Sequence, residues 1–133
     1  MKTKLWRLTN KNLQEDLAEA ATLLKAGELV AFPTETVYGL GANGLNPEAC
    51  KKIFAAKGRP VDNPLILHIS KMAEIYPLTS GLSAYAQKLA QAFWPGPMTM
   101  IVRKSDLISD VVTAGLDTVA VRMPSNPVAN TLI

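Results

Sequence analysis

The chain has 133 residues, of which 48% are hydrophobic and 19% are charged, with 14 lysines and arginines against 11 aspartates and glutamates. This composition excludes a disordered chain, which would carry fewer apolar residues and more net charge, and the length suits one domain with a sizeable core. The net charge of +3 at pH 7 is spread along the sequence without a basic tail, so it favours anionic ligands only weakly.

The cellular compartment is indicated by the cysteine content and the N-terminus. Cys50 is the single cysteine, which excludes an internal disulfide and favours a reducing environment. The sequence turns polar at Thr9 before an apolar stretch of signal-peptide length has accumulated, and no apolar run approaches the roughly 18 residues that span a bilayer. We therefore expect a cytoplasmic protein with no membrane partner.

Hydrophobic patterning divides the first half into a strand, a helix, a second strand, a loop and a second helix. Pro33 stops the second strand because proline has no N–H to donate to a central ladder. Asn46 followed by Pro47 is a favourable helix start, since the asparagine side chain can cap the first turn and proline suits its first position. In order, these elements cover residues 5–8, 13–24 with Gly27 as the C-cap, 29–32, 34–41 and 46–57.

The second half continues this alternation, which indicates an α/β layer structure. The segment 65–69 has apolar residues on both faces, which is typical of a covered, central strand. The last predicted helix begins at Pro127, and the sequence stops at Ile133 without a C-cap, so we expect a single domain over residues 1–133 that is cut before its C-terminal part. The other predicted elements are helical segments at 71–76 and 83–93 and strands at 98–103 and 118–123.

Gly39, Gly41 and Gly44 match the G-x-G-x-x-G pattern of dinucleotide-binding folds. In that pattern a second strand leads to an acidic residue that binds the ribose. Here the candidate acid, Asp62, lies in a proline-rich segment with no strand before it. We therefore interpret the glycines as serving a tight turn or a close backbone approach.

Two sets of polar side chains could bind a ligand, and each has a simpler interpretation. Thr34, Thr36 and Tyr38 alternate after a strand, so in an extended segment their hydroxyls would face one side and grip a polar ligand, or would simply suit a strand. Lys57 and Arg59 bring an ammonium and a guanidinium together, a combination that suits phosphates. The same two cations would also complement the negative end of a helix.

His68 is the only histidine and lies in an apolar segment, where we expect a core imidazole that is hydrogen-bonded to the backbone. No second histidine, cysteine pair or carboxylate cluster stands at metal-ligand spacing, so a structural zinc site is not predicted. No G-x-S-x-G nucleophile motif is present either. The sequence therefore offers no catalytic residue by motif.

Taken together, several segments of the chain resemble the YrdC-like threonylcarbamoyl-AMP synthase family, and they span nearly the whole chain after the first helix. The resemblance implies a twisted open mixed β-sheet with flanking helices. A chain that starts at its own methionine before the first helix is similar to the stand-alone bacterial type. The matching segments are Phe32–Gly41, Lys57–Pro60, Asn63–Leu65, His68, Trp94–Thr99 and Val121–Pro124.

The resemblance implies an enzyme that condenses L-threonine, bicarbonate and ATP into threonylcarbamoyl-AMP and pyrophosphate, for tRNA threonylcarbamoyladenosine modification. Mg²⁺ bound through the ATP phosphates would be the cofactor, with no protein metal ligand, and a tRNA-modifying transferase complex would be the partner. By position in the motifs, the threonine-binding residues would be Thr36, His68 and Arg122, and the ATP-binding residues Lys57, Arg59, Asn63 and Thr118.

The family pairs the motif at Lys57–Arg59 with an S-x-N motif after the final helix, and this sequence ends before that point. The resemblance therefore implies most of the threonine side but only part of the nucleotide side. Two alternatives stay open. One is a non-catalytic RNA-binding module of the same fold, with weak binding of double-stranded RNA or tRNA, and the other is the carbamoyl-transfer domain of a larger maturation protein.

Overall fold

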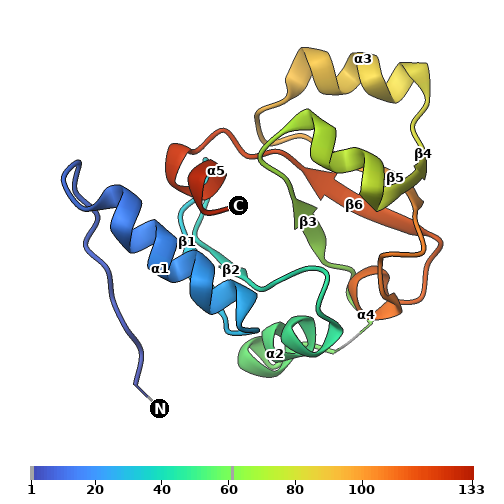
Figure 1. The fold of residues 1–133 in the computed structure, drawn as a ribbon. Helices are drawn as coiled ribbons and strands as arrows, with labels where there is room; N and C mark the ends of the chain where they lie inside the picture. Colours follow the sequence, from blue (N-terminus) through green and yellow to red (C-terminus); the bar gives the residue numbers. More distant parts are fainter. Residues whose placement is uncertain (1, 61) are drawn as a thin grey trace.

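The computed structural model describes residues 2–60 and 62–133 (Figure 1). Its described part contains a two-stranded antiparallel sheet and a four-stranded mixed sheet in the order β3-β6-β5-β4. Strand β3 runs parallel to β6, and the other neighbours are antiparallel. The strands are β1 (Val30–Phe32), β2 (Gly39–Gly41), β3 (Ile66–His68), β4 (Thr79–Gly81), β5 (Thr99–Lys104) and β6 (Thr118–Arg122).

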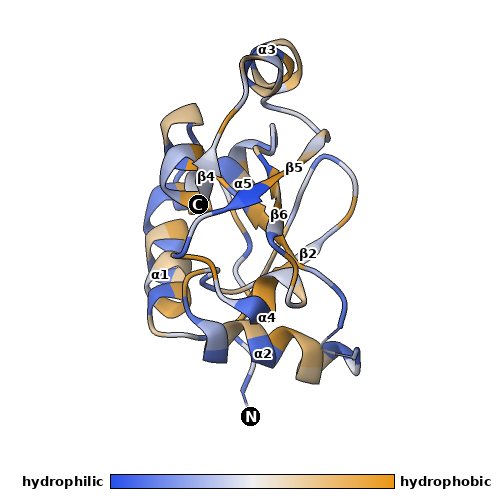
Figure 2. Cartoon of the chain, turned by 90° about the vertical axis from the view of Figure 1, so that its right-hand side faces the viewer, coloured by the Kyte–Doolittle hydropathy of each residue, from blue (hydrophilic) through white to orange (hydrophobic). Residues whose placement is uncertain are grey.

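Helices surround the two sheets, which confirms the predicted α/β class. The first and last helices, α1 and α5, lie side by side and pack against the two-stranded sheet, whereas α3 and α2 lie at opposite ends of the molecule (Figures 1 and 2). Among the described helices none is long and apolar enough to cross a membrane. The helices are α1 (Leu13–Lys25), α2 (Pro47–Lys57), the 3₁₀ helix η1 (Met72–Leu78), α3 (Ala84–Phe93), α4 (Asp110–Thr113) and α5 (Pro127–Leu132).

Two hydrophobic clusters hold these layers together. The larger one lies under the four-stranded sheet, where Val119 and Val121 of β6 are almost fully buried. The smaller one joins α1, β1 and α5 through residues such as Leu17, Phe32 and Ala129. Figure 2 shows hydrophobic and hydrophilic residues interspersed along α1 and α2, as expected for helices with one buried side.

The predicted helix boundaries at Asn46 and Gly27 are confirmed by the hydrogen bonds at those positions. The Asn46 side chain accepts from the backbone N–H of Glu48 at 3.1 Å and of Ala49 at 3.2 Å. Gly27 follows α1 with a φ of +85°, and Gly58 follows α2 with a φ of +62°. At both ends the glycine and the next residue donate back to the last helical turn, which is the Schellman arrangement.

Residues 5–8 form no strand, so that prediction is wrong. No described strand pairs with them. Trp6 and Leu8 pack instead against the cluster on α1, and the Trp6 indole N–H donates to Glu19 at 3.1 Å. Trp6 and Leu8 alternate along the chain because both pack against α1, and this alternation gives the same short hydrophobic pattern as a strand.

The prediction that residues 65–69 form a central strand is also wrong. In the described part of the chain β3 is an edge strand that pairs only with β6. Leu67 is buried in the core, but Ile66 is 39% exposed and lies on the wall of a pocket. An apolar pocket wall therefore produces the same sequence pattern as a strand that is covered on both faces.

Three short elements have no counterpart among the predicted ones. The end of the predicted loop 34–41 forms β2, and β4 and α4 also arise in segments without a prediction. Each has only three or four residues. A segment of that length shows no hydrophobic period, because a helical period needs at least two turns and a strand period several alternations.

Candidate functional site

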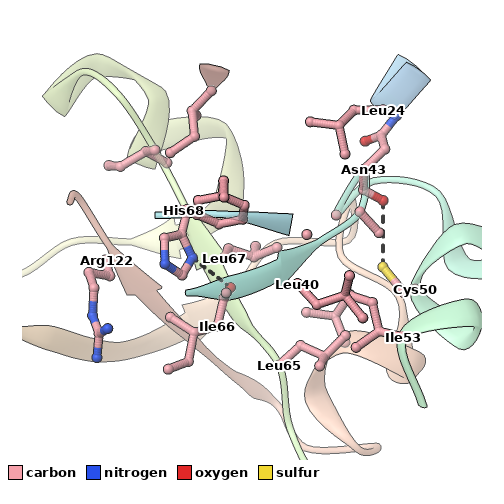
Figure 3. Close-up of a pocket in the computed structure, with 18 of the residues that line it drawn as sticks. Leu24, Leu40, Asn43, Cys50, Ile53, Leu65, Ile66, Leu67, His68 and Arg122 are labelled. Atoms are coloured by element: carbon pink, nitrogen blue, oxygen red, sulfur yellow. Dashed lines mark hydrogen bonds between the residues drawn. The ribbon is translucent and has the colours of Figure 1, made fainter. Parts of the chain in front are cut away.

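A pocket of about 840 Å³ is bordered by the β1–β2 hairpin, α2, β3 and the end of β6. Figure 3 shows His68 and Arg122 near one end of it and Asn43 and Cys50 near the other. Six of the seven predicted binding residues contribute to its walls, so the structure brings together side chains that are up to 86 positions apart (36 to 122). The six are Thr36, Lys57, Arg59, Asn63, His68 and Arg122.

Thr118, the seventh residue, lies outside the pocket walls but on the same strand face as Arg122. Along β6, Val119 and Val121 are buried while Thr118, Ala120 and Arg122 are half-buried, as the strand alternation requires. Thr118 begins β6, and Arg122 ends it. At about 3.3 Å per residue the two are roughly 13 Å apart along the strand.

Two of the predicted nucleotide residues and two of the predicted threonine residues lie at opposite ends of the parallel strands β3 and β6. His68 and Arg122 are register partners at the carboxyl ends of β3 and β6. Asn63 precedes β3, and Thr118 starts β6, so both stand at the amino ends. These four residues are therefore separated along the strand direction.

Arg122 lies between His68 and Thr99 at the carboxyl end of β6. It is paired in register with His68 on one side and with Thr99 of β5 on the other. Its Nε donates a hydrogen bond to Thr99 Oγ1 at 2.9 Å. No other described residue forms a hydrogen bond or ion pair with the Arg122 side chain, so its two terminal amino groups are available for a bidentate carboxylate contact.

His68 is held as a neutral imidazole beside Arg122. Burial lowers its pKa below the ordinary value of 6.5, and the nearby Arg122 charge lowers it further, against the opposing effects of the Ile66 hydrogen bond and the Glu35 charge. Nδ1 lies 3.0 Å from the Ile66 carbonyl oxygen, which can only accept, so Nδ1 carries the proton (Figure 3). Nε2 is then an acceptor that has no hydrogen-bond partner among the described residues.

Phe32 fixes the other side of the imidazole. The two rings meet edge to face, with centroids 6.0 Å apart and planes at 82°. The glycine pattern makes room for this ring, because a Cβ on Gly41 would lie 2.7 Å from a Phe32 ring carbon. A Cβ on Gly44 would likewise lie 2.5 Å from Leu67. The interpretation of these glycines as close backbone approaches is confirmed, and neither has the positive φ of a tight turn.

Thr34, Thr36 and Tyr38 do not share an extended face, contrary to the prediction. The segment bends between β1 and β2, and Thr34 Oγ1 accepts from the N–H of Thr36 at 3.3 Å. The two threonines reach the pocket walls, whereas Tyr38 is 77% exposed and does not. The reason is local, since threonine hydroxyls form turns with the backbone two residues on.

Lys57 and Arg59 lie at the end of α2 and on the pocket wall, so the structure is compatible with both interpretations. Lys57 ends α2, where its charge complements the helix dipole, and Arg59 donates its backbone N–H to Phe54 after the left-handed Gly58. Both side chains are exposed and contribute to the pocket walls. No acidic residue of the described chain pairs with either cation, so both are available to an anionic ligand.

Two residues of the site carry no role in the sequence prediction. Thr99 belongs to a matching motif, but only the fold shows that it holds Arg122. Glu35 has both carboxylate oxygens buried without a hydrogen-bond partner in the described chain. Its charge acts on His68. No sequence pattern signals this burial, because Glu35 lies between polar residues in an apparent loop.

The family assignment comes from comparison with known proteins. The model of the Sua5/YciO/YrdC family, described as "Telomere recombination", matches residues 22–133. The chain belongs to this family. The resemblance inferred from the motifs is thereby confirmed.

Two relatives that are about half identical to this chain carry the same function name. The chain is similar to the threonylcarbamoyl-AMP synthase of Pyrococcus abyssi, with 51% identity over 92% of this chain and 37% of the relative. It is also similar to the threonylcarbamoyl-AMP synthase of Bacillus subtilis, with 52% identity over 100% of this chain and 40% of the relative. The chain therefore spans about two fifths of the length of these relatives.

Solved structures confirm the fold. The P. abyssi Sua5 structure in complex with L-threonine superposes with a TM-score of 0.89 at 49% identity, covering 96% of this chain and 36% of that chain. Escherichia coli YciO superposes with a TM-score of 0.79 at 22% identity, covering 90% of this chain and 58% of that one. At that identity the second match bears on the fold alone.

Proposed function

We propose that this chain forms the threonine-binding part, and some of the nucleotide-binding part, of a threonylcarbamoyl-AMP synthase. The reaction would join L-threonine, bicarbonate and ATP into threonylcarbamoyl-AMP and pyrophosphate, for tRNA threonylcarbamoyladenosine modification. The names of the close relatives support this activity, and so does the L-threonine complex of P. abyssi Sua5. The observation that carries the proposal is the pair of free amino groups on Arg122 beside a neutral His68.

The threonine end of the proposal follows from these two side chains. The Arg122 fork suits the α-carboxylate of an amino acid, because two parallel N–H groups match two carboxylate oxygens. The neutral His68 offers Nε2 as an acceptor, which suits a hydroxyl or an amine of the same molecule. Thr36 lies on the wall of the same pocket and adds a further hydroxyl.

The nucleotide end would use Lys57, Arg59, Asn63 and Thr118. The two cations would neutralise phosphate charge, and Asn63 and Thr118 would add hydrogen bonds at the amino ends of β3 and β6. In the reaction, the threonine amine attacks carbon dioxide and loses a proton, or attacks bicarbonate with loss of water, and an oxygen of the resulting carbamate attacks the α-phosphorus of ATP. Pyrophosphate leaves. The protein's contribution is to position the reactants and to stabilise developing charge.

Mg²⁺ enters this proposal with ATP and not as a protein-bound ion. The described residues contain no group of three His, Cys, Asp or Glu side chains that could hold a metal. Phosphate oxygens are the ligands that Mg²⁺ commonly takes in nucleotide sites, so the residues present fit an ion that is held through ATP. When bound there, it would share the neutralisation of phosphate charge with Lys57 and Arg59.

The partners follow from the product. An acyl-adenylate is a reactive intermediate, so a tRNA-modifying transferase complex would consume it, and the cytoplasm is where ATP and tRNA meet. Weak contact of tRNA or double-stranded RNA with the exposed cations at Lys57 and Arg59 belongs to the same proposal.

The experiment is a pyrophosphate-release assay with ATP, in which L-threonine and bicarbonate are omitted in turn. The proposal predicts release only when both are present. A chain that binds RNA with steep salt dependence and shows no threonine-dependent release would instead be the RNA-binding module. Release that needs a carbamoyl donor other than threonine and bicarbonate would indicate a carbamoyl-transfer domain.

A further inference from the structure

The hydroxyl of Thr99 accepts a hydrogen bond from Arg122 Nε at 2.9 Å across neighbouring antiparallel strands. We propose that Thr99 is a positioning residue that fixes the direction of the Arg122 guanidinium for a bound α-carboxylate. The inference rests on the proposed function, because it takes the ligand of Arg122 to be L-threonine. It adds a residue to the site that touches Arg122 and not the substrate.

The backbone of Arg122 is held by strand pairing on both sides, so the freedom that remains lies in its side chain. β6 is paired on both sides, with β3 and with β5. The Arg122 carbonyl oxygen also accepts from the N–H of Ile69 at 3.0 Å. A long arginine side chain on such a strand still has many rotamers, and ordering them on binding weakens affinity. The bond to Thr99 selects one direction before the ligand arrives.

This bond uses the single N–H of Nε, which leaves both terminal amino groups for an end-on bidentate contact. The two terminal amino groups keep all four of their N–H groups, and Arg122 contributes to the pocket wall. The geometry therefore orients the group without occupying the donors that the carboxylate needs.

The segment before Thr99 is built to hold this residue against the end of β6. The N–H of Gly96 donates to the carbonyl of Met123 at 2.8 Å, one residue beyond Arg122. The buried Trp94 donates its indole N–H to the carbonyl of Met98 at 2.7 Å, one residue before Thr99. A Cβ on Gly96 would lie 2.8 Å from the backbone oxygen of Phe93, so this path admits only glycine there.

Thr99→Val tests the inference, because valine keeps the branched shape and removes the acceptor. We expect the dissociation constant for L-threonine, measured by calorimetry, to rise about tenfold, which corresponds to about 1.4 kcal/mol. Thr99→Ser, which keeps the hydroxyl, should stay within about twofold of the unchanged chain. Thr22→Val is the matched control, since the Thr22 hydroxyl bonds only to the Ala18 carbonyl on the exposed side of α1.

A second readout needs no ligand. The Arg122 Nε–H resonance should exchange slowly with solvent in the unchanged chain and in Thr99→Ser, and rapidly in Thr99→Val. The inference is overturned, with the proposed function intact, if Thr99→Val binds threonine as the unchanged chain does. It is also overturned if Thr99→Ser is as weak as Thr99→Val, since shape and not the hydroxyl would then matter. If the folded, unchanged chain does not bind threonine, the proposed function itself fails.

Discussion

His68 and Arg122 are register partners on the parallel strands β3 and β6, and the positive charge of Arg122 disfavours a second charge on the imidazole. This relationship joins two motifs that are 54 positions apart (68 to 122) into one ligand-binding end of the pocket. It also means that the protonation of His68 reports on the arrangement of the site. The chain has no other histidine to obscure that signal.

The pKa of His68 should lie below 6.5, because burial and the Arg122 charge both disfavour the imidazolium. Arg122→Gln should raise this pKa by removing the repelling charge. Glu35→Gln should lower it, since the Glu35 carboxylate favours the protonated ring. An NMR titration of the single histidine measures all three values, and a lower pKa in Arg122→Gln or a higher pKa in Glu35→Gln would refute the assigned environment.

The lowered pKa of His68 also predicts a pH dependence of stability. Between the folded pKa and 6.5 the unfolded chain binds more protons than the folded one, so the free energy of unfolding rises with pH in that window. As the pH falls from 6.5 to the folded pKa, this contribution is lost. Urea unfolding across the window should show a slope that is smaller in His68→Gln, and equal slopes would contradict the prediction.

Gly41→Ala should destabilise the fold by about 1–3 kcal/mol, which is typical of overpacking. The added Cβ would lie 2.7 Å from the Phe32 ring, which is also in contact with His68. Gly81→Ala is the control, because a Cβ there meets nothing within 4 Å. Chemical denaturation measures both changes. Equal effects of the two substitutions would mean that room for Phe32 is not what requires a glycine at position 41.

Arg59→Ala should reduce pyrophosphate release from ATP, threonine and bicarbonate while leaving the thermal midpoint unchanged. The guanidinium is exposed, lies on the pocket wall and has no ion-pair partner in the described chain, so its loss removes a phosphate contact and no packing. Lys51→Ala is the control, because Lys51 is a cation on the surface of α2 that already pairs with Glu48. Its loss should leave pyrophosphate release unchanged. Unchanged release in Arg59→Ala would remove this residue from the nucleotide end.

The sequence predicts the long elements of this fold well because their signals are local. Asn46 with Pro47, and Gly27 after a periodic helix, mark boundaries by hydrogen bonds that involve only nearby residues. The place of β3 at the sheet edge could not be predicted in this way, since an apolar pocket wall and an apolar core give the same pattern at Ile66.

The candidate binding residues could be selected from the sequence only where they belong to a family motif. Lys57, Arg59 and His68 each admit an ordinary structural explanation from spacing alone, and the structure confirms the helix-end position of Lys57 and the backbone hydrogen bond of His68. The role of Thr99 depends on which residue of β5 lies opposite Arg122, and the burial of Glu35 depends on how the hairpin folds back. Both are properties of tertiary structure, which no local pattern encodes.

The most direct test of the proposed threonine site is a calorimetric titration of the chain with L-threonine, with Arg122→Gln as the matched variant. The arrangement of Arg122, His68 and Thr99 predicts saturable binding at one site in the unchanged chain and a loss of at least tenfold in affinity in Arg122→Gln, as expected when a charge-assisted pair of hydrogen bonds is removed. A folded chain that gives no heat of binding with L-threonine, or the same affinity in both proteins, would contradict the account.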